Sequence, residues 1–414
     1  MINICIYEDT HYTQLYPLTY TRTAYQLFIG TNLILNKIEQ FFPSSNITLH
    51  CRNELKPTVK LALKQFPINK INNGTPCLFI NGRTILTQSL HNTLSRIDTA
   101  HNHLFLYKGN VVAAFLKGAE LDKLISQLAH GPIDNTTFYE SIRKKSITKQ
   151  LNQCQIIQYP WDLIQFNNDI IHSDFILKDQ PGIIKGNLRP YVSIYNEDNI
   201  FIDINTTIED YVVLDARKGP IYIEKNVTIT AHSRIEGPAF IGKHTVIMGA
   251  SLKCVSIGPS CKLGGEISHS IIYGNSNKAH DGYIGNSYIG EWVNLGAGTT
   301  TSNLKNNYAE ISMTVNGDVL NTKQLLLGSI IGDYVKTSIH TSLNTGSLIG
   351  IGSTIFDVGL HAKVIPPFQW GPPHNYTRHQ FDKFINTTKV MMSRRSVTLA
   401  KAHEQLLQWL YTNS

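Results

Sequence analysis

A short polar segment brings together residue types that can carry out acyl-transfer chemistry. Lysine, histidine, aspartate and tyrosine fall within six residues of the run Asn275-Ser276-Asn277-Lys278-Ala279-His280-Asp281-Gly282-Tyr283. A neutral imidazole can take a proton from an attacking amine, and a neighbouring cation can gather an anionic substrate. We therefore predict that His280 is a general base for the attack of an amine on a thioester. The alternative is that this segment is only a polar corner of a repeat structure.

The next segment is suited to holding a ligand along the backbone. It reads Glu291-Trp292-Val293-Asn294-Leu295-Gly296-Ala297-Gly298-Thr299-Thr300-Thr301-Ser302-Asn303. Its small residues leave the backbone open to close approach. Asn294 and Asn303 add side-chain donors and acceptors. We therefore expect a cofactor to lie along this stretch.

A repeat of six residues positions both segments. Its longest unbroken series is Ile223, Ile229, Ile235, Ile241 and Ile247, and the same step recurs at Ile257 and Leu263, Ile289 and Leu295, and Ile349 and Ile355. This period fits short strands joined by tight corners, with three strands to a coil. The repeat, from about residue 190 to about 365, predicts a left-handed parallel β-helix. Residues 305–327 lose the period and contain Asn316-Gly317, which predicts a projecting loop or hairpin.

Two further regions flank the repeat, and the predicted boundaries are 1–185, 186–373 and 374–414. The first region alternates short apolar strands (2–7, 47–51, 77–80, 104–107) with helical stretches (25–42, 121–129, 138–149), which predicts an α/β domain. The last region has apolar residues at helical spacing, so we expect a helical tail that caps the open end of the β-helix.

These motifs resemble the bifunctional family that joins N-acetylglucosamine-1-phosphate uridylyltransferase to glucosamine-1-phosphate N-acetyltransferase, in a divergent subgroup of sugar nucleotidyltransferases. The matching residues are the His280 block, the Asn294 segment, Leu15-Tyr16-Pro17-Leu18-Thr19-Tyr20-Thr21-Arg22, Asn81-Gly82-Arg83 and Pro160-Trp161-Asp162. The resemblance implies an α/β nucleotidyltransferase-like domain followed by a hexapeptide β-helix. It also implies acetyl-CoA as co-substrate and assembly as a homotrimer.

Site residues follow from the same resemblance. It implies that His280 is the catalytic base, that Tyr283, Asn294 and Asn303 contact the amino sugar and acetyl group, and that Gly296 and Ala297 contact acetyl-CoA. The family lysine and arginine that hold the sugar phosphate fall at Ser268 and near Ala250. Lys253, Lys262 and Lys278 are our candidate replacements for them.

The first domain departs further from the family pattern. Thr10-His11-Tyr12 replaces a glycine-rich phosphate loop, and Arg83 replaces a metal-binding aspartate. Arginine cannot ligate Mg²⁺, which takes oxygen ligands. Arg22 and Arg83 are instead candidates for binding phosphate oxygens, and Asp162 for a replacement Mg²⁺ ligand. The alternative for Asp162 is a helix cap. The sequence does not define a set of metal ligands for this domain.

Composition narrows the class of partner. Of 414 residues only 16% are charged, and the net charge of +7 comes without a long basic run, so we expect a phosphorylated sugar, acetyl-CoA and UTP or dTTP rather than nucleic acid. There is no apolar run of membrane length, and the six scattered cysteines favour a cytoplasmic location.

Three functions follow from these observations. The first is an amino-sugar-phosphate N-acetyltransferase, linked to a divergent nucleotidyltransferase domain, for synthesis of a nucleotide sugar of the UDP-N-acetylglucosamine type. The second is a uridylyl- or thymidylyltransferase whose β-helix is structural. The third is a non-catalytic scaffold.

Overall fold

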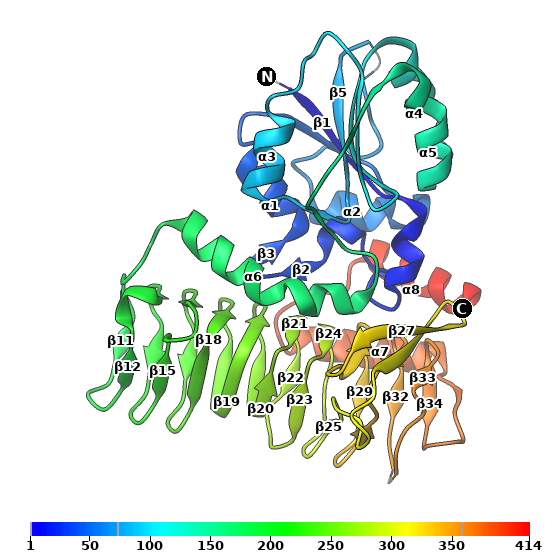
Figure 1. The fold of residues 1–414 in the computed structure, drawn as a ribbon. Coiled ribbons are helices and arrows are strands. Elements are labelled where there is room, and N and C mark those ends of the chain that lie inside the picture. The colour runs from blue at the N-terminus through cyan, green and yellow to red at the C-terminus, as the bar shows by residue number, and fades with distance from the viewer. Residues whose placement is uncertain (1, 73, 358) are drawn as a thin grey trace.

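The computed structural model, which describes residues 2–72, 74–357 and 359–414, consists of an α/β domain seated on one side of a long β-solenoid (Figure 1). Helix α6 (Pro160–Lys178) lies between the two parts, along the solenoid. The first contact of the solenoid follows closely, as a bridge between Ile184 and Ile202. The predicted fold class is therefore confirmed.

The α/β domain is built on a six-stranded sheet of order β4-β1-β5-β8-β7-β9. Its strands are β1 (Asn3–Tyr7), β4 (Asn46–Leu49), β5 (Cys77–Asn81), β7 (His103–Tyr107), β8 (Asn110–Leu116) and β9 (Ile147–Gln150). Its helices are α1 (Ile34–Phe41), α2 (Lys56–Ala62), α3 (Gln88–Leu94), α4 (Gly118–Leu128) and α5 (Asn135–Ile142). Strand β1 is parallel to β4 and β5, so β1 and β5 end at the same edge and bring their following residues together.

Several predicted elements differ from the observed ones. The four predicted strands are present, but the helix predicted over 25–42 begins only at Ile34, because β2 (Phe28–Ile29) and β3 (Asn32–Leu33) form a hairpin before it. The helix predicted over 138–149 ends at Ile142, since residues 147–150 join the sheet as β9. Two short strands, β6 (Thr84–Ile85) and β10 (Gln155–Ile156), pair beside the main sheet.

The solenoid has three faces, which we name by what covers them. The helix face contains β11 (Asn187–Leu188), β14 (Thr207–Ile208), β17 (Thr228–Ile229), the starts of β19 (Val246–Ile257) and β20 (Lys262–Ser268), β22 (Asn277–Lys278), β29 (Lys336–Thr337), β32 (Thr354–Ile355) and β34 (Gln369–Gly371). The open face contains β12 (Ser193–Tyr195), β15 (Val213–Asp215), the start of β18 (Arg234–Ile241), later parts of β19 and β20, β23 (Tyr283–Gly285), β25 (Thr300–Thr301) and β30 (Ser342–Leu343). The domain face contains β13 (Ile200–Ile202), β16 (Ile221–Ile223), the ends of β18 and β19, β21 (Ile271–Gly274), β24 (Tyr288–Glu291), β28 (Ser329–Ile331), β31 (Ser347–Ile349) and β33 (Val364–Ile365).

The interior of the solenoid is a stack of aliphatic side chains in parallel register. On the helix face Ile208 lies beside Ile229, then Ile247 and Leu263, all of them buried. Burying one such side chain contributes roughly 1.5–3 kcal/mol. The six-residue period therefore corresponds to one inward side chain per strand.

The outer surface of the domain face is apolar because the α/β domain covers it. Phe201, Tyr222 and Phe240 are in register and form stacked ring pairs with centroids 4.4 and 5.9 Å apart. The Tyr288 hydroxyl donates to the Phe28 carbonyl at 3.0 Å. These contacts fix the two parts against each other.

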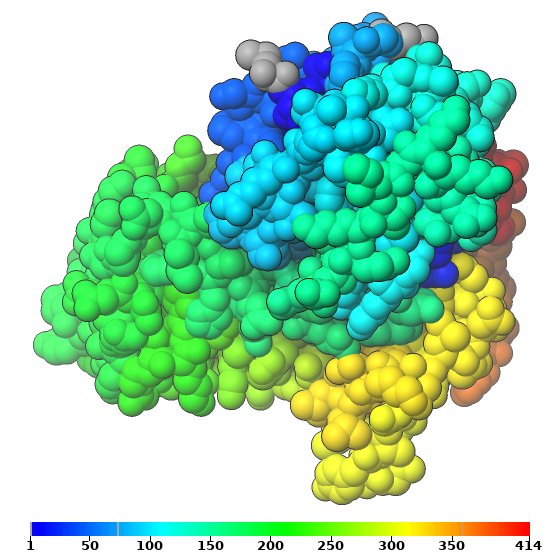
Figure 2. All heavy atoms as spheres, turned by 45° about the horizontal axis from the view of Figure 1, so that its top comes forward, coloured from blue at the N-terminus to red at the C-terminus, as the bar shows by residue number. Residues whose placement is uncertain are grey.

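The interruption of the repeat is a hairpin, as predicted. Strands β26 (Ile311–Val315) and β27 (Asp318–Gln324) are antiparallel, and Asn316 and Gly317 at the turn both have positive φ, 50° and 91°. The insertion, coloured yellow, protrudes beside the α/β domain in Figure 2. The Asn316 amide donates to the Thr13 hydroxyl at 3.4 Å, so the hairpin contacts the first domain.

The helices of the tail do not cap the end of the solenoid, contrary to our prediction, whereas a short strand at the start of the tail does. The edge of β34 is paired instead by the antiparallel strand β35 (Thr377–Arg378). Helix α7 (Phe381–Ser393) lies along the helix face, and α8 (Lys401–Asn413) packs on α2 of the first domain. The tail thus links the two parts through apolar contacts.

Candidate functional site

His280 lies at the corner between the helix face and the open face, directly after β22. Its side chain is exposed to solvent, and it donates or accepts no hydrogen bond among the residues that the structure describes. The imidazole is therefore accessible to a ligand at this corner.

Lys278 points into the solenoid, in the column otherwise filled by Ile229, Ile247 and Leu263. Its ammonium is buried and donates to the carbonyls of Gly264, at 3.0 Å, and His280, at 2.7 Å. Burial lowers its pKa to about 8. Sequence reasoning placed Lys278 against the substrate, whereas the structure places its ammonium beneath the His280 corner, where it fixes the backbone.

A polar cluster lies on the open-face side of this corner. The Tyr283 hydroxyl is 3.0 Å from the Ser268 hydroxyl and accepts from the Asn303 amide at 3.1 Å. Asn303 also donates to Asn286 at 2.8 Å. The structure thus brings together Tyr283 and Asn303, two of the predicted substrate contacts, on neighbouring coils.

A second cluster lies on the helix-face side. Asn294 is in register with Asn277, and the Asn277 amide donates to the Asn294 side chain at 3.4 Å. Both line a groove of about 650 Å³ between the helix face and α7, together with Lys262. The predicted residues Asn294 and Lys262 therefore share a cavity, separated by the corner from Tyr283 and Asn303.

The next coil continues the corner with small residues. The Ala297 carbonyl accepts from the His340 amide at 2.7 Å, and the Gly296 amide donates to the Thr337 hydroxyl at 3.0 Å. Gly298 has a φ of +73°, and an added Cβ would lie 2.5 Å from His340 Nδ1. Close packing of coils therefore requires glycine here, and the strip beside His280 is mostly backbone.

Lys253 lies away from this corner, on the open face. Its ammonium forms an ion pair with Glu236 at 3.4 Å, and Glu236 also pairs with Lys218 at 3.0 Å. Lys253 therefore already has a partner within an exposed charge network.

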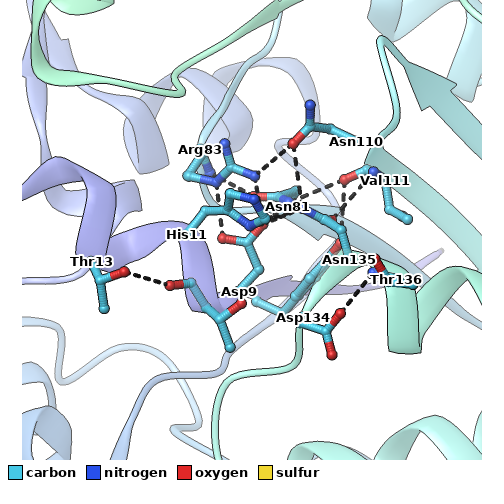
Figure 3. A network of polar contacts seen from close by, with 12 residues as sticks. Asp9, His11, Thr13, Asn81, Arg83, Asn110, Val111, Asp134, Asn135 and Thr136 are labelled. Atoms are coloured by element: carbon cyan, nitrogen blue, oxygen red, sulfur yellow. Dashed lines mark hydrogen bonds and ion pairs between the residues drawn. The ribbon is translucent and has the colours of Figure 1, made fainter. Parts of the chain in front are cut away.

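A buried polar network occupies the edge of the first domain where β1 and β5 end (Figure 3). The Arg83 guanidinium binds both carboxylate oxygens of Asp9, at 2.9 and 2.6 Å, and donates to the Ile157 carbonyl at 2.7 Å and to Asn110 at 3.1 Å. Burial raises the pKa of Asp9, but Arg83 and Asn81 outweigh it and hold that pKa below its usual value. Arg83 is turned inward, so its partners are protein atoms rather than an open phosphate site.

The rim of this network contains His11 and Asn135. The Asn135 amide donates to Asp9 at 3.1 Å and lies 3.1 Å from His11 Nδ1. Asp134 caps α5 by accepting from the amides of Thr136 and Thr137. Burial, and then the charge of Arg83, lower the pKa of His11. The network thus places a half-exposed imidazole over a neutralised carboxylate.

The residues at this edge do not fit a divalent metal ion. Both Asp9 oxygens are engaged by Arg83, and Asn81 and Asn135 add amide donors to the same carboxylate. No group of three or more histidine, cysteine, aspartate or glutamate side chains in the described ranges has the geometry of a metal site. The Asp162 carboxylate accepts from the backbone amides of Gln158 and Tyr159 at 2.7 and 3.0 Å. These bonds support the alternative that Asp162 caps helix α6.

Arg22 joins the two parts of the molecule instead of facing a phosphate. Its guanidinium binds Asp333 through two bonds, at 3.0 and 2.8 Å, and Glu291 at 3.2 Å. It also lies 3.8 Å above the Tyr273 ring. This arrangement is a buried ion cluster between the α/β domain and the domain face.

Sequence reasoning missed Asp9, Lys336 and Arg395. Asp9 has a local signal, since it is an acidic residue two positions after the end of the first strand. Lys336 lies in register with Asn294 on the next coil, but the hairpin insertion separates the two residues in the sequence. Arg395 follows α7 and reaches back to Ser260 and Asn277, a contact that only the folded chain creates.

The fold joins a nucleotidyltransferase-like α/β domain to a hexapeptide β-helix. Residues 4–180 match the family described as sugar nucleotidyl transferase. The chain is 32% identical over 197 residues to the bifunctional protein GlmU of Methanococcus vannielii, covering 47% of this chain and 41% of that protein. It is 34% identical over 172 residues to a bifunctional sugar-1-phosphate nucleotidylyltransferase/acetyltransferase of Sulfurisphaera tokodaii, covering 38% and 40%.

The predicted family resemblance is confirmed by these matches. The chain spans about two fifths of the length of either relative. Among solved structures, the polySia-specific acetyltransferase NeuO matches at a TM-score of 0.28 with 14% identity, covering 51% of this chain and 94% of that chain. In the described part of this chain, no helix has the length and apolarity needed to span a membrane.

Proposed function

We propose that the protein is an acetyl-CoA-dependent N-acetyltransferase that acts on an amino-sugar 1-phosphate, with glucosamine-1-phosphate as the expected substrate. The observation that carries this proposal is the corner at His280. His280 is exposed there, Tyr283 of the Tyr283–Asn303 cluster follows it by three residues, and the backbone strip at Gly296 and Ala297 lies on the next coil. The names of the bifunctional relatives support the same chemistry.

The proposed reaction is direct transfer without a covalent enzyme intermediate. His280 removes a proton from the sugar amine, whose nitrogen attacks the thioester carbonyl of acetyl-CoA. The carbon–sulfur bond then breaks, and the imidazolium of His280 returns the proton to the sulfur, so CoA leaves as the thiol. Tyr283 and Asn303 orient the sugar through hydrogen bonds. Lys278 acts from beneath, because its bond to the His280 carbonyl holds the corner in place.

The replacement His280→Ala tests this proposal. A general base contributes roughly 10²–10⁴-fold, so we expect acetyl transfer from acetyl-CoA to glucosamine-1-phosphate to fall by that factor, with an unchanged circular dichroism spectrum. His232→Ala is the control, because His232 is also an exposed histidine of the solenoid and lies on a different coil from His280. Full activity in His280→Ala would remove His280 from the reaction.

For the first domain we propose a divergent role, with weak or absent metal-dependent nucleotidyl transfer. The Arg83–Asp9 pair supports this, since it leaves no open carboxylate for a metal. The second candidate function, a uridylyl- or thymidylyltransferase with a structural β-helix, is favoured by the family match over residues 4–180. Purified protein with UTP or dTTP, Mg²⁺ and a sugar 1-phosphate separates the two, because rapid pyrophosphate release would establish the second. A protein inactive in both assays would be the scaffold of the third hypothesis.

We further propose a homotrimer in a reducing, cytoplasmic compartment. The open face is covered by neither the α/β domain nor α7, which supports its use in assembly. All six cysteines are free and buried. Sedimentation equilibrium measures the assembly, and a monomer at micromolar concentration would contradict it.

A further inference from the structure

The groove between the helix face and α7 is strongly basic. It has a volume of about 650 Å³ and is lined by five basic side chains and no aspartate or glutamate. The basic residues are His244, Lys262, Lys336, Arg394 and Arg395. A cavity with one sign of charge and low-dielectric walls concentrates ligands of the opposite sign.

The floor of the groove is a regular ladder of polar side chains. Lys262 pairs in register with Asn277, Asn277 with Asn294, and Asn294 with Lys336. Successive coils lie about 4.8 Å apart, so the two lysine backbones are roughly 14 Å apart with two amides between them. This spacing suits a ligand with more than one phosphate group or an extended phosphate ester.

The cations that line the groove take part in none of the ion pairs found among residues 2–72, 74–357 and 359–414. Burial lowers the pKa of Lys336 to about 8, and no carboxylate of the described residues lies within ion-pairing distance of it. Arg395 donates to the Ser260 carbonyl and the Asn277 side chain, which are both neutral. The nearby carboxylate of Glu291 is already bound by Arg22 and Asn275. Lys336 and Arg395 are partly buried, whereas Lys262 and Arg394 are exposed at the groove. Withdrawing an unpaired charge from water is costly, so a bound anion would compensate the partly buried cations.

We propose that this groove binds a small phosphorylated ligand, with Lys262 and Lys336 on its phosphate oxygens and the Asn277–Asn294 pair between them. Two sources supply that chemistry: the phosphates of CoA and the diphosphate of a nucleotide sugar. The CoA alternative rests on the proposed acetyl transfer, whereas binding of a phosphorylated ligand by the groove does not require the side chain of His280.

Calorimetric titration of the full chain with inorganic pyrophosphate tests this site. In the double variant Lys262→Met/Lys336→Met we expect affinity to fall about 100-fold, roughly tenfold for each charge-assisted contact. The matched control is Lys225→Met/Lys123→Met, which removes two exposed lysines outside the groove and should stay within about twofold of wild type. Equal affinity in wild type and the groove variant, or no binding at millimolar pyrophosphate, would overturn the proposal.

Two additions make the result decisive. Arg394→Gln changes an exposed groove residue and should weaken binding even if the Lys336 replacement perturbs folding. Displacement of pyrophosphate by CoA but not by a UDP-sugar identifies CoA as the source, and the reverse identifies a nucleotide sugar. Unchanged pyrophosphate affinity in His280→Ala would show that the groove is independent of the proposed base.

Discussion

The ion cluster around Arg22 allows a quantitative prediction about how the two parts of the molecule are held together. The Arg22 side chain is only 6% exposed, and its guanidinium makes three ionic hydrogen bonds, two to Asp333 and one to Glu291. The replacement Arg22→Met would leave both carboxylates at the interface without their cation. Removing one partner of a buried pair costs about 3–5 kcal/mol.

We expect the loss of stability in Arg22→Met to fall in the lower half of this range of about 3–5 kcal/mol, because both carboxylates keep other stabilising contacts. Asp333 would still accept from the Glu291 amide at 2.7 Å and from the Thr21 hydroxyl, and Glu291 keeps 27% of its side chain exposed. We therefore expect Arg22→Met to lower the free energy of unfolding by about 3–4 kcal/mol at pH 7. Urea titration followed by both tryptophan fluorescence and far-ultraviolet circular dichroism measures this value.

The loss should depend on pH and on the partner residue. Burial raises the pKa of Glu291, although Arg22 opposes the shift, so the pKa of Glu291 would rise further without Arg22. Acids with raised folded-state pKa values gain stability as pH falls, so the deficit of Arg22→Met should shrink below pH 5.

Two comparison variants show whether the loss comes from the buried cluster. The double variant Arg22→Met/Asp333→Asn should recover part of the loss, because it also removes a stranded charge. Arg143→Met is the control, since Arg143 pairs with Glu140 at the surface and should leave the unfolding curve unchanged. A loss below about 1 kcal/mol, or strict additivity of Arg22→Met and Asp333→Asn, would refute the reasoning.

Two further predictions follow from other buried groups. Lys278→Met should reduce acetyl transfer roughly 10- to 100-fold, because the corner at His280 loses its anchor. The free energy of unfolding of Lys278→Met should change by less than about 2 kcal/mol, because the loss of two hydrogen bonds is offset by removal of a buried charge. Wild-type acetyl transfer in this variant would show that Lys278 does not position the corner. Burial raises the pKa of Glu8 to about 7 despite its pair with Arg52, so its contribution to stability is lost as pH rises from about 5 to 8. In Glu8→Gln that part of the pH dependence should disappear, and an unaltered slope would contradict the assignment.

The sequence by itself determined the architecture of the solenoid, its hairpin and the order of the parts. Those features are local: one inward aliphatic per six residues, and Asn316-Gly317 at a turn with positive φ. The sequence also identified His280, Tyr283 and Asn303 as candidate site residues, because all three occur in compact motifs that resemble a known family. The same local reasoning placed a helix over 25–42, where a hairpin pairs residues 28–29 with residues 32–33.

Only the tertiary structure decided what each charged side chain does. Arg22 meets Asp333 across 311 positions of sequence, and Arg83 meets Asp9 across 74, so no local pattern could pair them. The direction of Lys278 depended on strand register, which places it in the column of Leu263 and inside the solenoid. The basic groove exists because α7 folds back along the helix face. Period and composition fix which residues form a coil, whereas long-range packing fixes which charges are buried, paired or left open to a ligand.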